Sequence, residues 1–142
     1  SGTSTCVKGI NGRIRVVGAE PFNASDAYTS FTTGNLTPSD NPITVADGLL
    51  TSLSELTFSV IRKNVDEILT AKEETIIECM LLVWERMKII IEPSSATVLA
   101  VIKENPGLLA RDPFDSKSEN TLKPHQQLDY LGILLSSVSS TT

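Results

Sequence analysis

Two carboxylates in the first part of the chain are spaced so that they could hold a hard metal ion. Glu20 and Asp26 bracket a turn that follows an apolar, β-branched run, so an intervening backbone carbonyl can converge with both side chains. Magnesium and calcium ions prefer such oxygen ligands, with water in the remaining positions. Carboxylates in turns also commonly cap or solvate the chain, and the spacing by itself leaves both roles open.

A third carboxylate, Glu92, lies between an apolar run and the sequence Pro93-Ser94-Ser95, which is typical of a helix start. A junction between apolar surface and a helix N-terminus can hold a small polar ligand. Alternatively, the helix dipole alone could favour this carboxylate by about 0.3–1 kcal/mol. Arg86 and Lys88 precede it, and both can reach one ligand only if their helix ends there.

Composition argues against several classes of partner and site. The 142 residues carry a formal net charge of -5 and no basic block, so neither a nucleic acid nor an anionic membrane is an expected partner. No apolar run approaches the ~20 residues that span a bilayer, and no signal peptide is in view, so we expect a cytoplasmic protein. Cys6 and Cys79 are expected to be reduced and buried or half-buried, and His125, the only histidine, leaves a zinc site short of ligands.

The elements that position these residues alternate between helix and strand. Hydrophobic periodicity predicts helices at 1–10, 54–63, about 73–87 and 94–103, and strands at 13–19, 65–69 and 131–135. Residues 22–48 and 107–127 are rich in turn-forming residues and are expected to be loops. This alternation favours an α/β fold with a mostly parallel sheet flanked by helices. Glu20 would then lie at the carboxyl end of a strand, where such sheets usually bind ligands.

The predicted helix that ends at Met87 has two distinctive features. Thr70 and Glu73 have the spacing of a capping box, which predicts the helix start. The helical spacing of the apolar residues predicts a face that packs on the core, and the apolar run at 89–91 is also expected to be buried. The residues of that face are Ile76, Ile77, Met80, Leu81, Val83, Trp84 and Met87.

Three motifs together resemble the serine racemase and serine/threonine dehydratase family, which are fold-type II enzymes that use pyridoxal phosphate (PLP). They are the string from Trp84 to Ser95, the Ala46-Asp47-Gly48 turn and the segment that starts at Glu20. The resemblance implies a Mg²⁺ or Ca²⁺ site formed by Glu20, the carbonyl of Ala24 and Asp26. It also implies that Glu92 and Gly48 lie near the cofactor.

The resemblance implies further contacts near the C-terminus and at a subunit interface. Ser136 matches a serine that contacts the pyridine nitrogen, although Ser137-Val138-Ser139 follows it where the family has Gly-Gly-Asn. In animal serine racemases, the residues that match Arg86 and Lys88 lie near a nucleotide effector at the subunit interface. A nucleotide effector and a homodimer are therefore implied. The family's Schiff-base lysine context and glycine-rich phosphate loop have no match in this sequence.

The resemblance thus implies that residues 1–142 are one incomplete domain of a PLP-dependent enzyme, with the N-terminal half absent. The intact enzyme would take an α-proton from a small amino acid such as serine or threonine, and so racemise it or eliminate water. Threonine ammonia-lyase and aspartate racemase are alternatives within this class. A hypothesis of a different class is a non-catalytic fragment or pseudoenzyme that binds a divalent cation or dimerises.

Overall fold

A parallel three-stranded sheet in the order β2-β1-β3 forms the centre of the fold. The computed structural model describes residues 1–110 and 132–135, with only the backbone given for 109–110 and 132–135. The strands are β1 (Val16–Pro21), β2 (Glu67–Ala71) and β3 (Gly132–Leu135). Central β1 pairs Val17 with Glu67 on one side and Val16 with Gly132 on the other. The predicted parallel sheet is confirmed, and each strand begins slightly later than expected.

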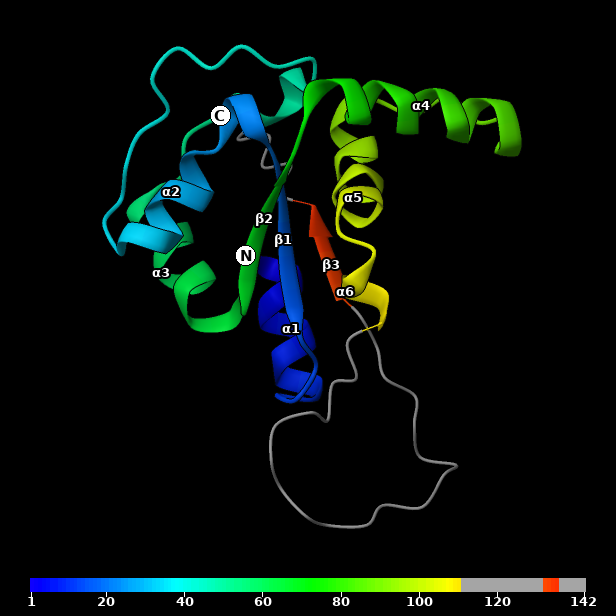
Figure 1. Cartoon of the computed structure of the whole chain (residues 1–142). Helices are drawn as coiled ribbons and strands as arrows, with labels where there is room; N and C mark the ends of the chain where they lie inside the picture. Colours follow the sequence, from blue (N-terminus) through cyan, green and yellow to red (C-terminus); the bar gives the residue numbers. More distant parts are fainter. Residues whose placement is uncertain (111–131, 136–142) are drawn as a thin grey trace, which may run out of the picture.

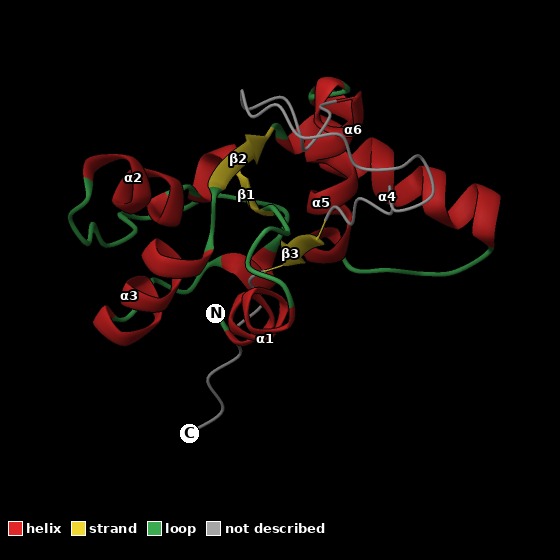
Figure 2. Cartoon of the chain, turned by 90° about the horizontal axis from the view of Figure 1, so that it is seen from below, coloured by secondary structure: helices red, strands yellow, loops and turns green. Residues whose placement is uncertain are grey.

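Helices cover both faces of this sheet (Figures 1 and 2). On one side lie α1 (Gly2–Ile10), α2 (Asp26–Thr33) and α3 (Glu55–Asn64). On the other side α5 (Pro93–Glu104) packs on all three strands, α4 (Glu73–Met87) packs on α5, and α6 (Gly107–Ala110) follows. A short 3-10 turn, η1 (Phe22–Ala24), follows β1, and a second one, η2 (Asp47–Leu49), precedes α3.

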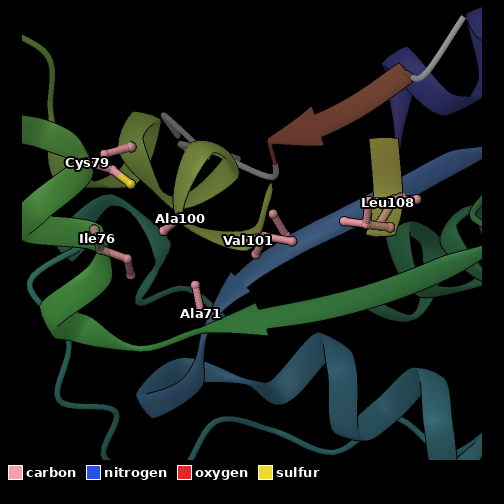
Figure 3. Close-up of a cluster of buried hydrophobic side chains, with 9 residues drawn as sticks. Ala71, Ile76, Cys79, Ala100, Val101 and Leu108 are labelled. Atoms are coloured by element: carbon pink, nitrogen blue, oxygen red, sulfur yellow. The ribbon is translucent and has the colours of Figure 1, made fainter. Parts of the chain in front are cut away.

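Each face of the sheet has its own hydrophobic core because side chains alternate along β1. Val17 and Ala19 face α4 and α5, in the cluster shown in Figure 3. Its other members are Ala71, Ile76, Cys79, Ala96, Ala100, Val101 and Leu108. Val16 faces the opposite way, with Ala27, Ile61, Val65 and Ile68. The alanines on α5 let this helix approach the sheet closely.

The segment 22–48 contains a helix, α2, that was expected to be a loop. Its first turn is held by Glu20, whose carboxylate accepts hydrogen bonds from two backbone N–H groups of the helix. The helix ends at Gly34, which has a left-handed φ of 76 that favours glycine. The other expected loop, 107–127, begins with α6, and its residues beyond 110 lie outside the described part of the chain.

The predicted capping box at α4 is wrong. Thr70 belongs to β2, and the N-cap position of α4 is occupied by Lys72, whose side chain makes no capping hydrogen bond. Glu73 turns instead toward the preceding loop, where its Oε2 accepts hydrogen bonds from Thr44 Oγ1 and from the Val45 N–H, both at 2.9 Å. A capping box does occur at Ser54, the N-cap of α3. Glu73 therefore holds residues 44–45, which directly precede η2, at the start of α4.

Glu73→Ala should lower the free energy of unfolding by about 1–3 kcal/mol, because two donors lose a charged acceptor. Urea unfolding followed by circular dichroism measures this change. Thr70→Ala is the matched control and should cost under about 1 kcal/mol, since Thr70 only contributes to the strand. A Thr70→Ala effect as large as that of Glu73→Ala would restore the capping-box interpretation.

The second half of α4 does not face the core. Ile76 and Cys79 near its start are buried, whereas Trp84 is 56% exposed and Met87 is 62% exposed. In the following apolar run, Ile89 and Ile90 are 49% and 84% exposed, whereas Ile91 is half-buried against the core, so the expected burial is wrong for the end of α4 and for these two isoleucines. Figure 1 shows why, since α4 extends past α5 and away from the sheet.

Two expectations from composition can also be compared with the fold. Both cysteines are free, and Cys79 is buried, but Cys6 is exposed, against the expectation that it would be at least half-buried. In the described part of the chain, none of the helices has the length and apolar content that a membrane span requires.

Candidate active site at the carboxyl edge of the sheet

Most of the predicted site residues lie on elements that meet at the carboxyl edge of the sheet. Strand β1 delivers Glu20 there, and η1 and the start of α2 follow it directly. Helix α5 begins at the same edge, and η2 packs on it (Figure 1). This edge is where open α/β sheets usually bind ligands. Ser136 would follow β3, but it lies outside the described residues.

Glu20 is a buried carboxylate at the end of β1, only 6% exposed. Its Oε1 accepts from the Ala27 N–H at 3.1 Å, and its Oε2 accepts from the Tyr28 N–H at 2.8 Å. Burial raises the pKa of Glu20 to about 7, and the nearby charge of Asp26 adds to this, while the two hydrogen bonds act in the opposite direction. Glu20 therefore changes charge near neutral pH.

Asp26, the first residue of α2, is buried beside it at 7% exposure. Its Oδ2 accepts from the Leu53 N–H at 3.3 Å, and burial raises its pKa. Two buried carboxylates disfavour each other's charge unless a proton or a cation is present. The buried Ala24 ends η1 between them. Two carboxylates and the Ala24 carbonyl are oxygen ligands that suit a hard cation. The Glu20 and Asp26 side chains also accept hydrogen bonds from backbone N–H groups.

This pair is not a complete set of ligands by itself. Within residues 1–110 and 132–135, no group of three or more His, Cys, Asp or Glu side chains could hold a metal ion. Two carboxylates and one carbonyl would therefore need several water molecules to complete the coordination of Mg²⁺ or Ca²⁺.

Gly48 and Ser94 form a close contact that sequence analysis missed. A Cβ atom on Gly48 would lie 2.8 Å from Ser94 Oγ, so only a glycine fits here without a shift. Ser94 is 5% exposed, and its hydroxyl has no hydrogen-bond partner among the described residues. A flat glycine next to an unpaired buried hydroxyl fits an aromatic ligand with polar substituents, as PLP is. The only sequence signal was the serine after Pro93 at a helix start.

Glu92 is the N-cap residue of α5, as its position before Pro93 predicted. Its backbone carbonyl accepts from Ser95 and Ala96, but its exposed side chain makes no capping hydrogen bond. The backbone of Glu92 is thus held at the helix N-terminus, and its exposed carboxylate is available to a ligand.

Arg86 and Lys88 lie at the far end of α4, and both are exposed. The helix ends at Met87, and Lys88 caps it with a left-handed φ of 58. The condition for both side chains to reach one ligand is therefore met. Because α4 extends away from the sheet, this pair is separate from the carboxyl edge (Figure 1).

Comparisons with known proteins give the chain's relatives. The family model described as "Pyridoxal-phosphate dependent enzyme" matches residues 1–114. The serine racemase of Dictyostelium discoideum is 50% identical over 105 residues, which are 72% of this chain and 32% of that protein. The beta-hydroxyaspartate dehydratase of Paracoccus denitrificans is 44% identical over 110 residues, 78% of this chain and 35% of that protein.

A solved structure agrees with these relatives in fold. The threonine deaminase of T.th. has a TM-score of 0.72 and 39% identity, and the match covers 75% of this chain and 37% of that one. The chain spans about a third of the length of the curated relatives it matches. The match over most of the sequence, with relatives at this identity, shows that the chain belongs to the pyridoxal-phosphate dependent enzyme family.

Proposed function

We propose that this chain is part of a PLP-dependent racemase and ammonia-lyase that acts on small β-hydroxy amino acids. The observation that carries the proposal is the similarity to relatives named for serine and β-hydroxyaspartate, together with a structure named for threonine. All three amino acids carry a hydroxyl group on the β carbon. Racemisation and elimination of that hydroxyl both begin with removal of the α-proton, and bound PLP stabilises the carbanion that remains.

The chain's own residues would form one wall of the cofactor site. Gly48 gives a flat surface without a side chain, and Glu92 would place a negative charge beside the ring. Ser136 would contact the pyridine nitrogen, as the resemblance implies. The roles of Gly48 and Glu92 are supported by the contact of Gly48 with α5 and by the position of Glu92 at the start of that helix.

We infer a second, structural site for Mg²⁺ or Ca²⁺ at Glu20, the Ala24 carbonyl and Asp26. A cation there would neutralise two buried carboxylates and join the end of β1 to the start of α2. Asp26 also holds the backbone at Leu53, so the ion would steady the loop that carries Gly48. The proposed cation would thus support the cofactor wall indirectly, through Asp26 and the backbone at Leu53.

We also propose that the exposed end of α4 is the surface through which two copies of the protein associate. Arg86 and Lys88 lie at this end, and a nucleotide effector bound there would bridge the two copies. The exposed apolar side chains of α4 support the association. The same surface also fits the alternative of a non-catalytic protein that dimerises, and the carboxylate pair of Glu20 and Asp26 fits one that binds a cation. A cytoplasmic location stays a prediction, which the two free cysteines favour.

Activity measurements test the proposed reaction. With PLP and Mg²⁺, the longest natural form of this protein should form D-serine from L-serine, and 2-oxo acids from L-serine, L-threonine and L-threo-3-hydroxyaspartate. The 142-residue chain should be inactive alone, because none of its lysines has the family's Schiff-base context. Chiral chromatography detects D-serine; a coupled lactate dehydrogenase assay detects the oxo acids from serine and threonine, and a coupled malate dehydrogenase assay detects that from 3-hydroxyaspartate.

L-alanine is the substrate control, because it has no β-hydroxyl group to eliminate and should give no oxo acid. Failure of the longest natural form on every hydroxyl-bearing substrate would favour the non-catalytic alternative. Activity of the 142-residue chain alone would show that it contains the reactive lysine after all.

A further inference from the structure

We propose that the Ser94 hydroxyl is a cofactor-binding group, which makes a hydrogen bond to a polar atom of the PLP ring. The inference rests on the proposed function and adds a residue to its cofactor wall. It begins from an unusual feature of Ser94, a buried hydroxyl group that makes no hydrogen bond within the described part of the chain.

The other buried hydroxyls show how unusual this is. Four hydroxyl side chains are buried in residues 1–108, those of Ser4, Ser30, Ser94 and Thr97. Ser4 donates to the Ser1 carbonyl at 2.7 Å, Ser30 accepts from the Thr37 N–H at 2.9 Å, and Thr97 donates to the Pro93 carbonyl at 3.2 Å. Ser94 alone among these four is unpaired. A buried polar group without a partner is costly, so such groups are commonly held for a ligand or water.

The position of Ser94 argues against a purely structural role. It is the second residue of the 12-residue helix α5, where serine often caps, but Glu92 already occupies the N-cap position. Glu73 Oε1 is also buried without a partner among the described residues, yet its carboxylate is held through Oε2 by Thr44 and Val45. Ser94 has no such second contact.

The direction of the hydroxyl points to the cofactor wall. Ser94 Oγ faces the side of Gly48 from which a side chain would project, since a Cβ added to this glycine would lie 2.8 Å from the hydroxyl oxygen. Gly48 is the residue that the proposed function puts against the ring. A ligand that stacks on this glycine would therefore come within reach of the hydroxyl, and it would supply the missing hydrogen bond.

Binding of pyridoxamine 5′-phosphate tests the inference. This compound has no aldehyde, so it forms no adducts with lysines, and its fluorescence reports binding to the longest natural form of the protein after bound PLP has been removed. Ser94→Ala should raise the Kd about fivefold or more, because the variant loses about one hydrogen bond to the ligand. Ser95→Ala is the matched control, since Ser95 is an exposed neighbour on the same helix turn, and should leave the Kd unchanged.

A second measurement needs no cofactor. Gly48→Ala should lower the Tm, and adding Ser94→Ala should recover most of the loss, because the remaining Ser94 Cβ would lie 3.6 Å from the new methyl group. Unchanged binding by Ser94→Ala, while the wild type binds, would overturn this inference alone. No binding by the wild type at millimolar ligand would overturn both the inference and the proposed cofactor site.

Discussion

In the absence of metal, the chain should lose about 3 kcal/mol of stability as the pH rises from about 4.5 to 8, and millimolar Mg²⁺ or Ca²⁺ should restore much of it at pH 8. The cause is Glu20, whose pKa rises from 4.5 to about 7 on folding, mainly by burial. Asp26, whose pKa is also raised by burial, contributes in the same direction.

The sign follows from proton binding. Between pH 4.5 and about 7 the folded state holds a proton on Glu20 that the unfolded state has released, so rising pH favours unfolding. This contribution is fully present below pH 4.5 and is lost as the pH passes through about 7. A cation can replace the proton, because it also neutralises the buried pair. It should therefore stabilise strongly at pH 8 and hardly at pH 5.

Urea unfolding at several pH values, with EDTA or with added cation, measures both effects. Asp26→Ala should remove the cation's stabilisation and its calorimetric binding signal, whereas Glu55→Gln, a change at an exposed carboxylate of α3, should keep both. Equal cation binding by wild type and Asp26→Ala would count decisively against the site. A pH profile that stays equally steep in Glu20→Gln would show that another group causes the pH dependence.

The features that the sequence predicted correctly depend on local periodicity or on fixed backbone preferences. Helix α5 was predicted because Pro93 and Asn105-Pro106-Gly107 mark its two ends, and the apolar run before Glu20 predicted the central strand. Parallel pairing followed from the alternation of elements. Glu20 could likewise be placed near the end of a strand, because the apolar run stops there. Glu92 could be placed just before a helix, because Pro93 marks the start of α5.

The features that the sequence missed depend on contacts between distant segments. Helix α2 has only 8 residues, and its first turn is fixed by Glu20 from the preceding strand. Glu73 has the form of a capping residue, but a loop 28 residues earlier takes its carboxylate. The unpaired hydroxyl of Ser94 becomes visible only when η2 is placed against α5. Periodicity identified α4 as a helix, but it could not reveal that α5 covers only its first half.

Trp84→Lys should convert the proposed dimer to a monomer at micromolar concentration. Trp84 belongs to the exposed apolar surface on α4 and the segment after it, and it lines a hollow of about 160 Å³ with Met80, Ile90 and Ile91. The surface also includes Ile77, Leu81, Met87 and Ile89, with 38–62% exposure. A tryptophan that is buried in an interface commonly contributes about 2 kcal/mol or more to association, roughly 30-fold in Kd.

Light scattering coupled to size-exclusion chromatography measures the mass of each variant across a dilution series. Leu56→Lys is the matched control, because Leu56 is also an exposed apolar residue on a helix, with 75% exposure, but it lies on α3 at the other face of the sheet. It should leave the dimer intact, since exposure alone does not define an interface. Dissociation by Leu56→Lys and not by Trp84→Lys would move the interface to α3. It would also separate Arg86 and Lys88 from any contact between subunits, and so remove the basis for an effector there.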